Sequence, residues 1–123
     1  MPASDFQYFN PVAVLQKLHG DPAVLARLAR AYRQELPQQI SQLQPLAAMG
    51  NLDATRGLLH QLRATFGMFE ARRAAAIERH ISLALHTQGT VPADHLHSLA
   101  CEMIGLDWEL EQFLKSSLQA AEG

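Results

Sequence analysis

The sequence predicts an all-α protein: an antiparallel, up-down-up-down four-helix bundle with a short extra helix at its N-terminal end. No stretch shows the sustained alternation of β-branched residues that is typical of strands. Apolar residues instead recur at spacings of three and four over several long segments. Short connections between these segments favour antiparallel neighbours. The length of 123 residues suits a single domain over 1–123.

The first two helices each open with a capping side chain followed by a proline at the first helical position. The two pairs are Asn10-Pro11 and Asp21-Pro22. They predict a short helix over about 11–18 and a long one over about 22–47. Pro37 lies inside the long helix and is expected to kink it without ending it, because the apolar pattern resumes at Ile40.

Three further helices are expected over about 52–68, 71–86 and 92–120, the first of them capped by Asn51 or Asp53. Each carries an apolar stripe for the core. The stripes are Leu58, Leu59, Leu62 and Phe66; then Ala74, Ile77, Ile81 and Leu85; then Leu96, Leu99, Met103, Leu106, Leu110, Phe113 or Leu114, and Leu118. Gly105 is expected to weaken the last helix.

The composition excludes several classes of function. A net charge of −2 gives no basic surface for nucleic acid. No apolar run approaches the length of a membrane span, and the N-terminal residues lack the features of a signal peptide. Cys101 is the single cysteine and has no internal partner for a disulfide. We therefore expect a cytoplasmic protein that neither binds nucleic acid nor inserts into membranes.

His60 lies on the outer face of the expected helix over 52–68. On a helical wheel of about 100° per residue, the core residues of this helix gather in one arc, and His60 points roughly 140° away from its middle. The imidazole is therefore expected to be exposed. Gly57, Ala64 and Gly67 share this face, although two exposed glycines cost about 2 kcal/mol in helix propensity. A flat surface beside an exposed imidazole indicates that something large approaches it.

Two arginines flank His60 on the same face. Arg56 lies four residues before it and Arg63 three residues after it. Neighbouring cations favour the neutral, nucleophilic imidazole and offer donors to an anion on its ring. This arrangement suits a histidine that accepts a phosphoryl group and passes it on, because phosphoryl transfer depends mainly on positioning and charge stabilisation.

These residues resemble the motif of the histidine phosphotransfer (HPt) family, the intermediate carriers of multistep phosphorelays. The family motif is a histidine, an aliphatic residue at +2, a lysine at +3, a small residue at +4 and a glycine at +7. The matching residues are His60, Leu62, Arg63, Ala64 and Gly67. The resemblance covers nearly the whole chain: residues 9–43 resemble the first two helices of the family, and residues 49–60 resemble the run into its active helix.

Four positions depart from the family pattern. Arg63 replaces the usual lysine and keeps its charge in a different geometry. Ala64 replaces a glycine, and Glu70 stands where a glycine is frequent. Many members also carry a glutamine or glutamate on the following helix that hydrogen-bonds the second ring nitrogen of the histidine. By gapless count Ser82 occupies that position.

The resemblance implies a phosphocarrier rather than an enzyme. His60 would be the phosphoacceptor, Arg63 would stabilise the phosphate, and the Ser82 hydroxyl is a candidate hydrogen-bond partner of the imidazole. The residues expected around the phosphate or against a docked receiver are Arg56, Gly57, Ala64, Gly67, Met68, Arg79 and His86. The implied partners are receiver domains of a hybrid histidine kinase or of a response regulator, and the receiver would bring the Mg²⁺. We expect a monomer with no ATP site and no bound cofactor.

Three alternatives remain open. The first is an adaptor of the same fold that binds a receiver without carrying phosphate. The second is a dimerisation fragment of a sensor kinase, because HQLRAT also resembles an H-box; Gln61 and the two further helices argue against it. The third is a metal-binding bundle. It would use His80, His86, His95 or His97, but no di-iron carboxylate pattern accompanies them, so no metal site is expected.

Overall fold

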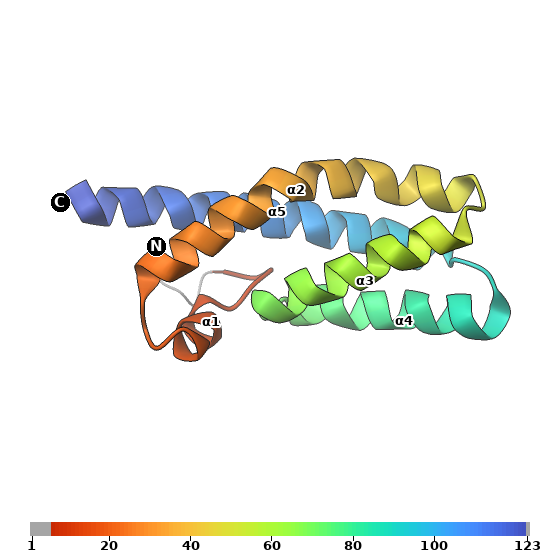
Figure 1. Cartoon of the computed structure of the whole chain (residues 1–123), viewed down its shortest axis with the longest axis horizontal. Helices are drawn as coiled ribbons and strands as arrows, with labels where there is room; N and C mark the ends of the chain where they lie inside the picture. Colours follow the sequence, from red (N-terminus) through yellow and green to blue (C-terminus); the bar gives the residue numbers. More distant parts are fainter. Residues whose placement is uncertain (1–5, 123) are drawn as a thin grey trace.

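The computed structural model describes residues 6–122, with the side chains of residues 6–117. Over that range it contains five helices and no strand, which confirms the all-α prediction (Figure 1). The helices are α1 (Pro11–Lys17), α2 (Pro22–Ala48), α3 (Leu52–Met68), α4 (Arg72–Gln88) and α5 (Ala93–Glu122). Each bound lies within two residues of the position expected from the sequence. Within the described chain, no helix combines the length and the apolar character needed to cross a membrane.

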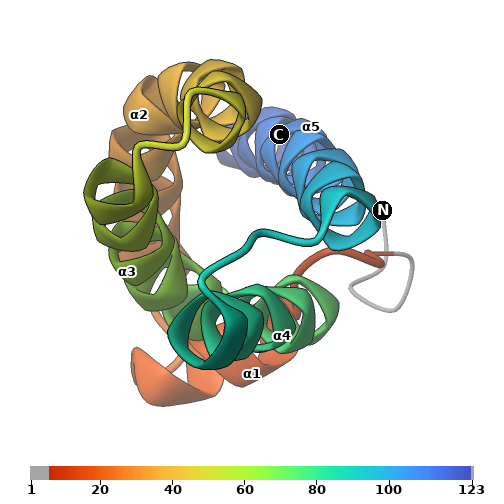
Figure 2. The same ribbon diagram turned by 90° about the vertical axis from the view of Figure 1, so that its right-hand side faces the viewer.

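The four long helices form a bundle around one core. α2 packs against α3 and α5, and α4 packs against the same two helices. Viewed end-on, the helices follow one another around the core in the order α2, α3, α4 and α5, so that α3 and α5 lie diagonally opposite (Figure 2). The short helix α1 contacts α2 and lies close to the end of α3 (Figure 1).

The helices begin where the capping signals predict. Asn10, Asp21 and Asn51 each accept a hydrogen bond from a backbone N–H in the first turn of α1, α2 and α3. α2 continues through both Pro37 and Pro45 to Ala48. Each proline lacks the N–H for one helical hydrogen bond, but neither loss ends the helix.

The core consists largely of the predicted apolar stripes. Leu58, Leu59, Leu62 and Phe66 of α3 are all buried, as are the α5 residues from Leu96 to Leu110 in the expected stripe. The prediction was wrong at one position of α4. Ile77 is only partly buried, and Glu78 occupies the fully buried place beside Ile81. Leu118 lies outside the residues whose side chains are described.

The N-terminal segment, residues 6–10, lies along α5 and is held by a buried glutamate. The carboxylate of Glu109 accepts hydrogen bonds from the backbone N–H groups of Gln7, Tyr8 and Phe9, at 2.5, 2.6 and 3.3 Å. A Cβ at Gly105 would lie 2.3 Å from the Tyr8 ring. Gly105 is therefore required for the close approach of this segment, and does not merely weaken α5 as the sequence suggested.

Candidate functional site

His60 is exposed on the outer face of α3, and the small residues predicted around it are exposed as well. A Cβ added at Gly57 or at Gly67 would meet no atom within 4 Å. The packing of the chain itself therefore does not require a glycine at either position. Both glycines lower the helix propensity of α3, and no close contact within the described structure compensates for that cost.

A shallow hollow of about 310 Å³ lies beside His60, between α3 and α4. Its lining residues are Arg56, His60, Arg63, Ser82, Leu85 and His86. Five residues that the sequence placed at the site thus border one depression, although they come from two helices. The polar lining is mostly cationic or hydrogen-bond donating, which suits an anion.

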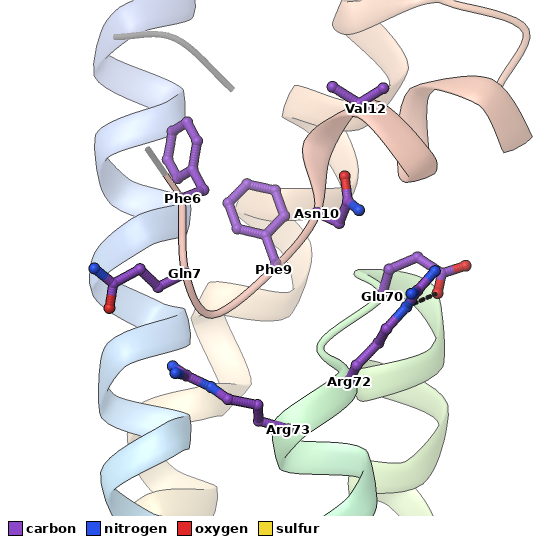
Figure 3. A pocket seen from close by; sticks show the side chains of 8 residues that line it. All are labelled: Phe6, Gln7, Phe9, Asn10, Val12, Glu70, Arg72 and Arg73. Atoms are coloured by element: carbon purple, nitrogen blue, oxygen red, sulfur yellow. Dashed lines mark ion pairs between the residues drawn. The ribbon is translucent and has the colours of Figure 1, made fainter. Parts of the chain in front are cut away.

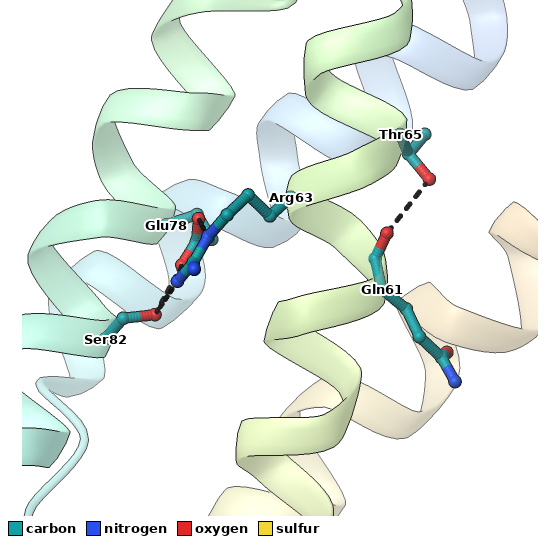
Figure 4. Close-up of polar contacts among 5 residues, drawn as sticks. All are labelled: Gln61, Arg63, Thr65, Glu78 and Ser82. Carbon is teal, nitrogen blue, oxygen red and sulfur yellow. Dashed lines mark hydrogen bonds and ion pairs between the residues drawn. The ribbon is translucent and has the colours of Figure 1, made fainter.

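The centre of this region is a polar network that joins α3 to α4 (Figure 4). The guanidinium of Arg63 donates two hydrogen bonds to the Glu78 carboxylate, from Nε to Oε1 at 2.9 Å and from Nη2 to Oε2 at 3.0 Å. The hydroxyl of Ser82 donates a short hydrogen bond to Glu78 Oε2 and accepts from Arg63 Nη2 at 3.4 Å. The Glu78 side chain is 1% exposed, whereas that of Arg63 is 56% exposed.

The network shifts the titration of both charged partners. Burial raises the pKa of Glu78, but hydrogen bonds from Arg63 and Ser82 and the positive charges of Arg63 and Arg79 together hold it below the ordinary value. The pKa of Arg63 is raised, first by its hydrogen bond to Glu78 and then by the charge of that carboxylate. Glu78 is therefore ionised and paired at neutral pH.

The two groups expected to assist His60 are thus engaged with Glu78. The proton of the Ser82 hydroxyl goes to Glu78 and not to the imidazole. Arg63 uses Nε and Nη2 in the network, which leaves Nη1 to face other groups. Arg56 forms a 3.3 Å pair with Asp53 on the helix surface.

Glu78 is the residue that the sequence interpretation missed. It lies four residues after Ala74 and three before Ile81, so it falls on the apolar stripe of α4. The sequence contained one indication of its role: a glutamate at a buried position of α4 requires a cation, and Arg63 on the neighbouring helix could supply it. We assigned the buried position to Ile77 instead, and therefore did not consider Glu78.

The remaining predicted residues lie around the edge of the site. Arg79 borders a second hollow of about 600 Å³ that shares Arg63, Ser82 and His86 with the first and adds the exposed Leu83. Ala64 is exposed on α3, while Met68 is partly buried and packs against the core. The predicted residues therefore all lie on α3 and α4, but Arg79 does not border the His60 hollow.

The end of α3 is fixed by Lys17 of α1. Its ammonium group donates to the carbonyl oxygens of Gly67 and Met68, at 2.8 and 3.3 Å, and pairs with Glu70 at 3.2 Å. These carbonyls belong to the last turn of α3, where no later helical N–H reaches them, although the Gly67 oxygen also accepts from the Glu70 backbone N–H at 3.4 Å. The cation also complements the negative end of the helix dipole.

A third hollow, of about 410 Å³, lies at the other end of α4, beside the N-terminal segment (Figure 3). It is lined by Phe6, Gln7, Phe9, Asn10, Val12, Glu70, Arg72 and Arg73. Arg73 is used internally: it pairs with Glu102 at 2.8 Å and stacks on the Tyr8 ring, with its guanidinium carbon 5.0 Å from the ring centroid.

The histidines of α4 and α5 do not assemble a metal centre among the residues described. His80 and His95 have ring centroids 5.7 Å apart, and His97 Nε2 lies 3.7 Å from Cys101 Sγ. No group of three or more potential ligands gathers in the described residues.

Comparison with protein-family models, with curated proteins and with solved structures finds no match to this chain.

Proposed function

We propose that the chain is a histidine phosphotransfer protein, or an HPt domain of a larger protein, in a two-component phosphorelay. The observation that carries the proposal is the exposed His60 on a helix face with two glycines that no internal contact requires. A flat, solvent-facing imidazole is accessible to the concave active site of another protein. The resemblance of the sequence around His60 to the HPt motif points the same way.

The proposed topology is an up-down-up-down bundle in which successive long helices run antiparallel. The short connections between α2, α3, α4 and α5 support it. The colours in Figure 1 also support it, because residue numbers increase in opposite directions along successive helices. This topology brings α3 and α4 together along their length, so that a receiver docked over His60 would contact both.

The proposed reaction is a reversible transfer between two proteins. A neutral ring nitrogen of His60, expected to be Nε2, attacks the phosphorus of an aspartyl phosphate on a receiver domain. The new N–P bond forms as the P–O bond to the aspartate breaks, and the aspartate leaves as a carboxylate. A second receiver then takes the phosphoryl group from His60. The receiver would supply Mg²⁺, and this chain would supply the nucleophile and nearby cations, without kinase activity of its own.

Within this proposal, Arg63 contributes a donor whose position is fixed. Its pairing with Glu78 holds the guanidinium plane at the edge of the His60 hollow. Nη1 then points to groups other than Glu78, and a phosphoryl group on His60 would find its donors already oriented. Pre-oriented donors stabilise developing charge without a reorganisation cost at the moment of reaction.

One observation favours a second candidate, the adaptor that binds a receiver without accepting phosphate. The Ser82 hydroxyl and two of the three Arg63 nitrogens are engaged with Glu78, so Ser82 donates nothing to the imidazole and only Nη1 of Arg63 is left for a phosphate. An adaptor would need the flat face but not the nucleophile. The two candidates share a docking surface and differ only in chemistry.

Incubation with a phosphorylated receiver separates the candidates. A carrier acquires label that is acid-labile and alkali-stable, and the variant His60→Gln acquires none. His95→Gln is the matched control, because His95 is an exposed histidine on α5, the helix opposite α3, and does not line the His60 hollow. Tight receiver binding without label would support the adaptor, and absence of both binding and label would refute the proposal.

A further inference from the structure

α5 carries an exposed stripe that faces away from the bundle. Among the large apolar side chains, Ile104 and Trp108 are 55% and 53% exposed. Cys101 and His97 are also exposed on the same helix. The four residues are spaced by four, three and four positions, which places them along one side of α5. We call His97, Cys101, Ile104 and Trp108 the outer α5 stripe.

This stripe is separate from the face that α5 gives to the core. Leu99, Met103, Leu106 and Leu110 are fully buried and pack into the bundle. With Asp94 before the stripe and Glu111 and Lys115 after it, the exposed positions of this side of α5 alternate in steps of three and four, which is the heptad spacing of a helix that pairs with another helix. A bundle helix that needed only solubility would carry polar residues at these positions.

The charges at the two ends of the stripe indicate what covers it. Asp94 precedes it by three residues, and Glu111 and Lys115 follow it by three and seven, all on the same side of the helix. Glu111 already pairs with Arg33 of α2 at 3.6 Å and with Lys115 at 3.4 Å, while the Lys115 side chain stays 61% exposed and able to reach a partner. In a parallel pair of two such helices, Asp94 would meet Asp94 and Lys115 would meet Lys115. In an antiparallel pair centred near Ile104, Asp94 of each copy faces Lys115 of the other, because the positions lie at similar distances on either side of the centre.

We propose that the outer α5 stripe is the contact surface for a second copy of this chain, joined as an antiparallel α5–α5 pair about a two-fold axis near Ile104. A two-fold contact uses the same patch on both copies and must therefore be self-complementary, which the opposite charges of Asp94 and Lys115 provide. His97 of one copy then lies near Glu111 of the other. This proposal differs from the monomer that the family resemblance implies.

The dimer leaves the His60 surface free. α3 lies diagonally across the core from α5 (Figure 2), so a second copy seated on α5 does not cover the hollow beside His60. The inference does not depend on the proposed function, since it uses only α5. A contact through one helix per copy is at the small end of specific interfaces, so the dimer should form in a concentration-dependent way.

The single tryptophan makes the proposal directly measurable. Sedimentation over a range of concentrations should show dimer formation, and the emission of Trp108 should shift to shorter wavelength in step as the indole leaves water. Ile104→Glu should abolish both changes while keeping the probe. Leu83→Glu is the matched control, because Leu83 is 60% exposed on α4, outside the stripe. A monomeric wild type at its highest soluble concentration, or a dimer unaffected by Ile104→Glu, overturns the proposal.

Charge reversal tests the antiparallel arrangement. Asp94→Lys should weaken the dimer, because it places like charges opposite one another, and adding Lys115→Asp should restore it. A parallel pair predicts no loss for the single reversal. A dimer whose affinity ignores Asp94→Lys would therefore refute the antiparallel contact, and so would a dimer that protects His60 rather than Trp108 from solvent.

Discussion

Removing the Arg63 side chain should reveal what holds the α3–α4 pair together. In Arg63→Ala, the Glu78 carboxylate loses two hydrogen bonds and its nearest positive charge while remaining in the protein interior. Breaking a fully buried ion pair from one side costs about 3–5 kcal/mol. Here only Glu78 is buried, so the shortened side chain lets water reach the carboxylate, and Ser82 keeps its bond. We expect a loss of about 1–2 kcal/mol in the free energy of unfolding at neutral pH.

The effect of Arg63→Ala on the free energy of unfolding should depend on pH, because Glu78 titrates. In the wild type the pKa of Glu78 is lowered on folding, so its contribution to stability is present above the unfolded value of about 4.3 and is lost as the pH falls through the folded value. Without Arg63, the pKa of Glu78 rises relative to the wild type, because the carboxylate loses two hydrogen bonds and its nearest positive charge. The difference in unfolding free energy between wild type and variant is therefore largest at neutral pH and becomes smaller as the pH falls towards 4.

Urea unfolding at neutral pH and near pH 4, followed by circular dichroism, measures both effects. Arg56→Ala is the matched control: its partner Asp53 is 99% exposed, so no measurable loss is expected. The double variant Arg63→Met/Glu78→Leu should recover most of the loss, because it removes the buried charge as well. If Arg63→Ala behaves like Arg56→Ala, or its deficit is the same at both pH values, the pair does not support the buried carboxylate.

Four other substitutions test the site and the N-terminal segment. Gly57→Ala and Gly67→Ala should each raise the free energy of unfolding by about 0.5–1 kcal/mol, yet slow phosphotransfer from a receiver; faster or equal transfer would contradict the docking role. Gly105→Ala should lower the melting temperature, with a cost of about 1–3 kcal/mol, because its methyl group would overlap the Tyr8 ring. Glu109→Ala should expose the amides of the N-terminal segment to rapid hydrogen exchange, while unchanged protection would refute the anchor.

The helices of this protein could be predicted because their signals are local. Capping side chains such as Asn10 and Asp21 lie next to the turns that they stabilise, and the apolar period reports which face is buried. The exposure of His60 followed from the same period. These features depend on neighbours within one or two turns of the same helix.

The polar contacts between helices could not be predicted in the same way. Glu78 and Glu109 are buried because of partners on other elements: an arginine on α3 and the backbone of the N-terminal segment. A core predicted only from apolar residues omits such carboxylates, although a carboxylate can be buried when hydrogen-bond partners satisfy it. For this reason the hydrogen-bond partner of Ser82 was predicted wrongly. We expected the Ser82 hydroxyl to bond His60, whereas it bonds Glu78.

The Glu109 anchor has a consequence for how the chain folds. It joins residues 7–9 to a position 100–102 residues later, so almost the whole chain must be looped before these bonds form. Contacts of such long range form late, after the four long helices have packed. During synthesis, residues 7–9 would therefore wait until α5 has emerged before they find their place, and on unfolding they would be the first to detach.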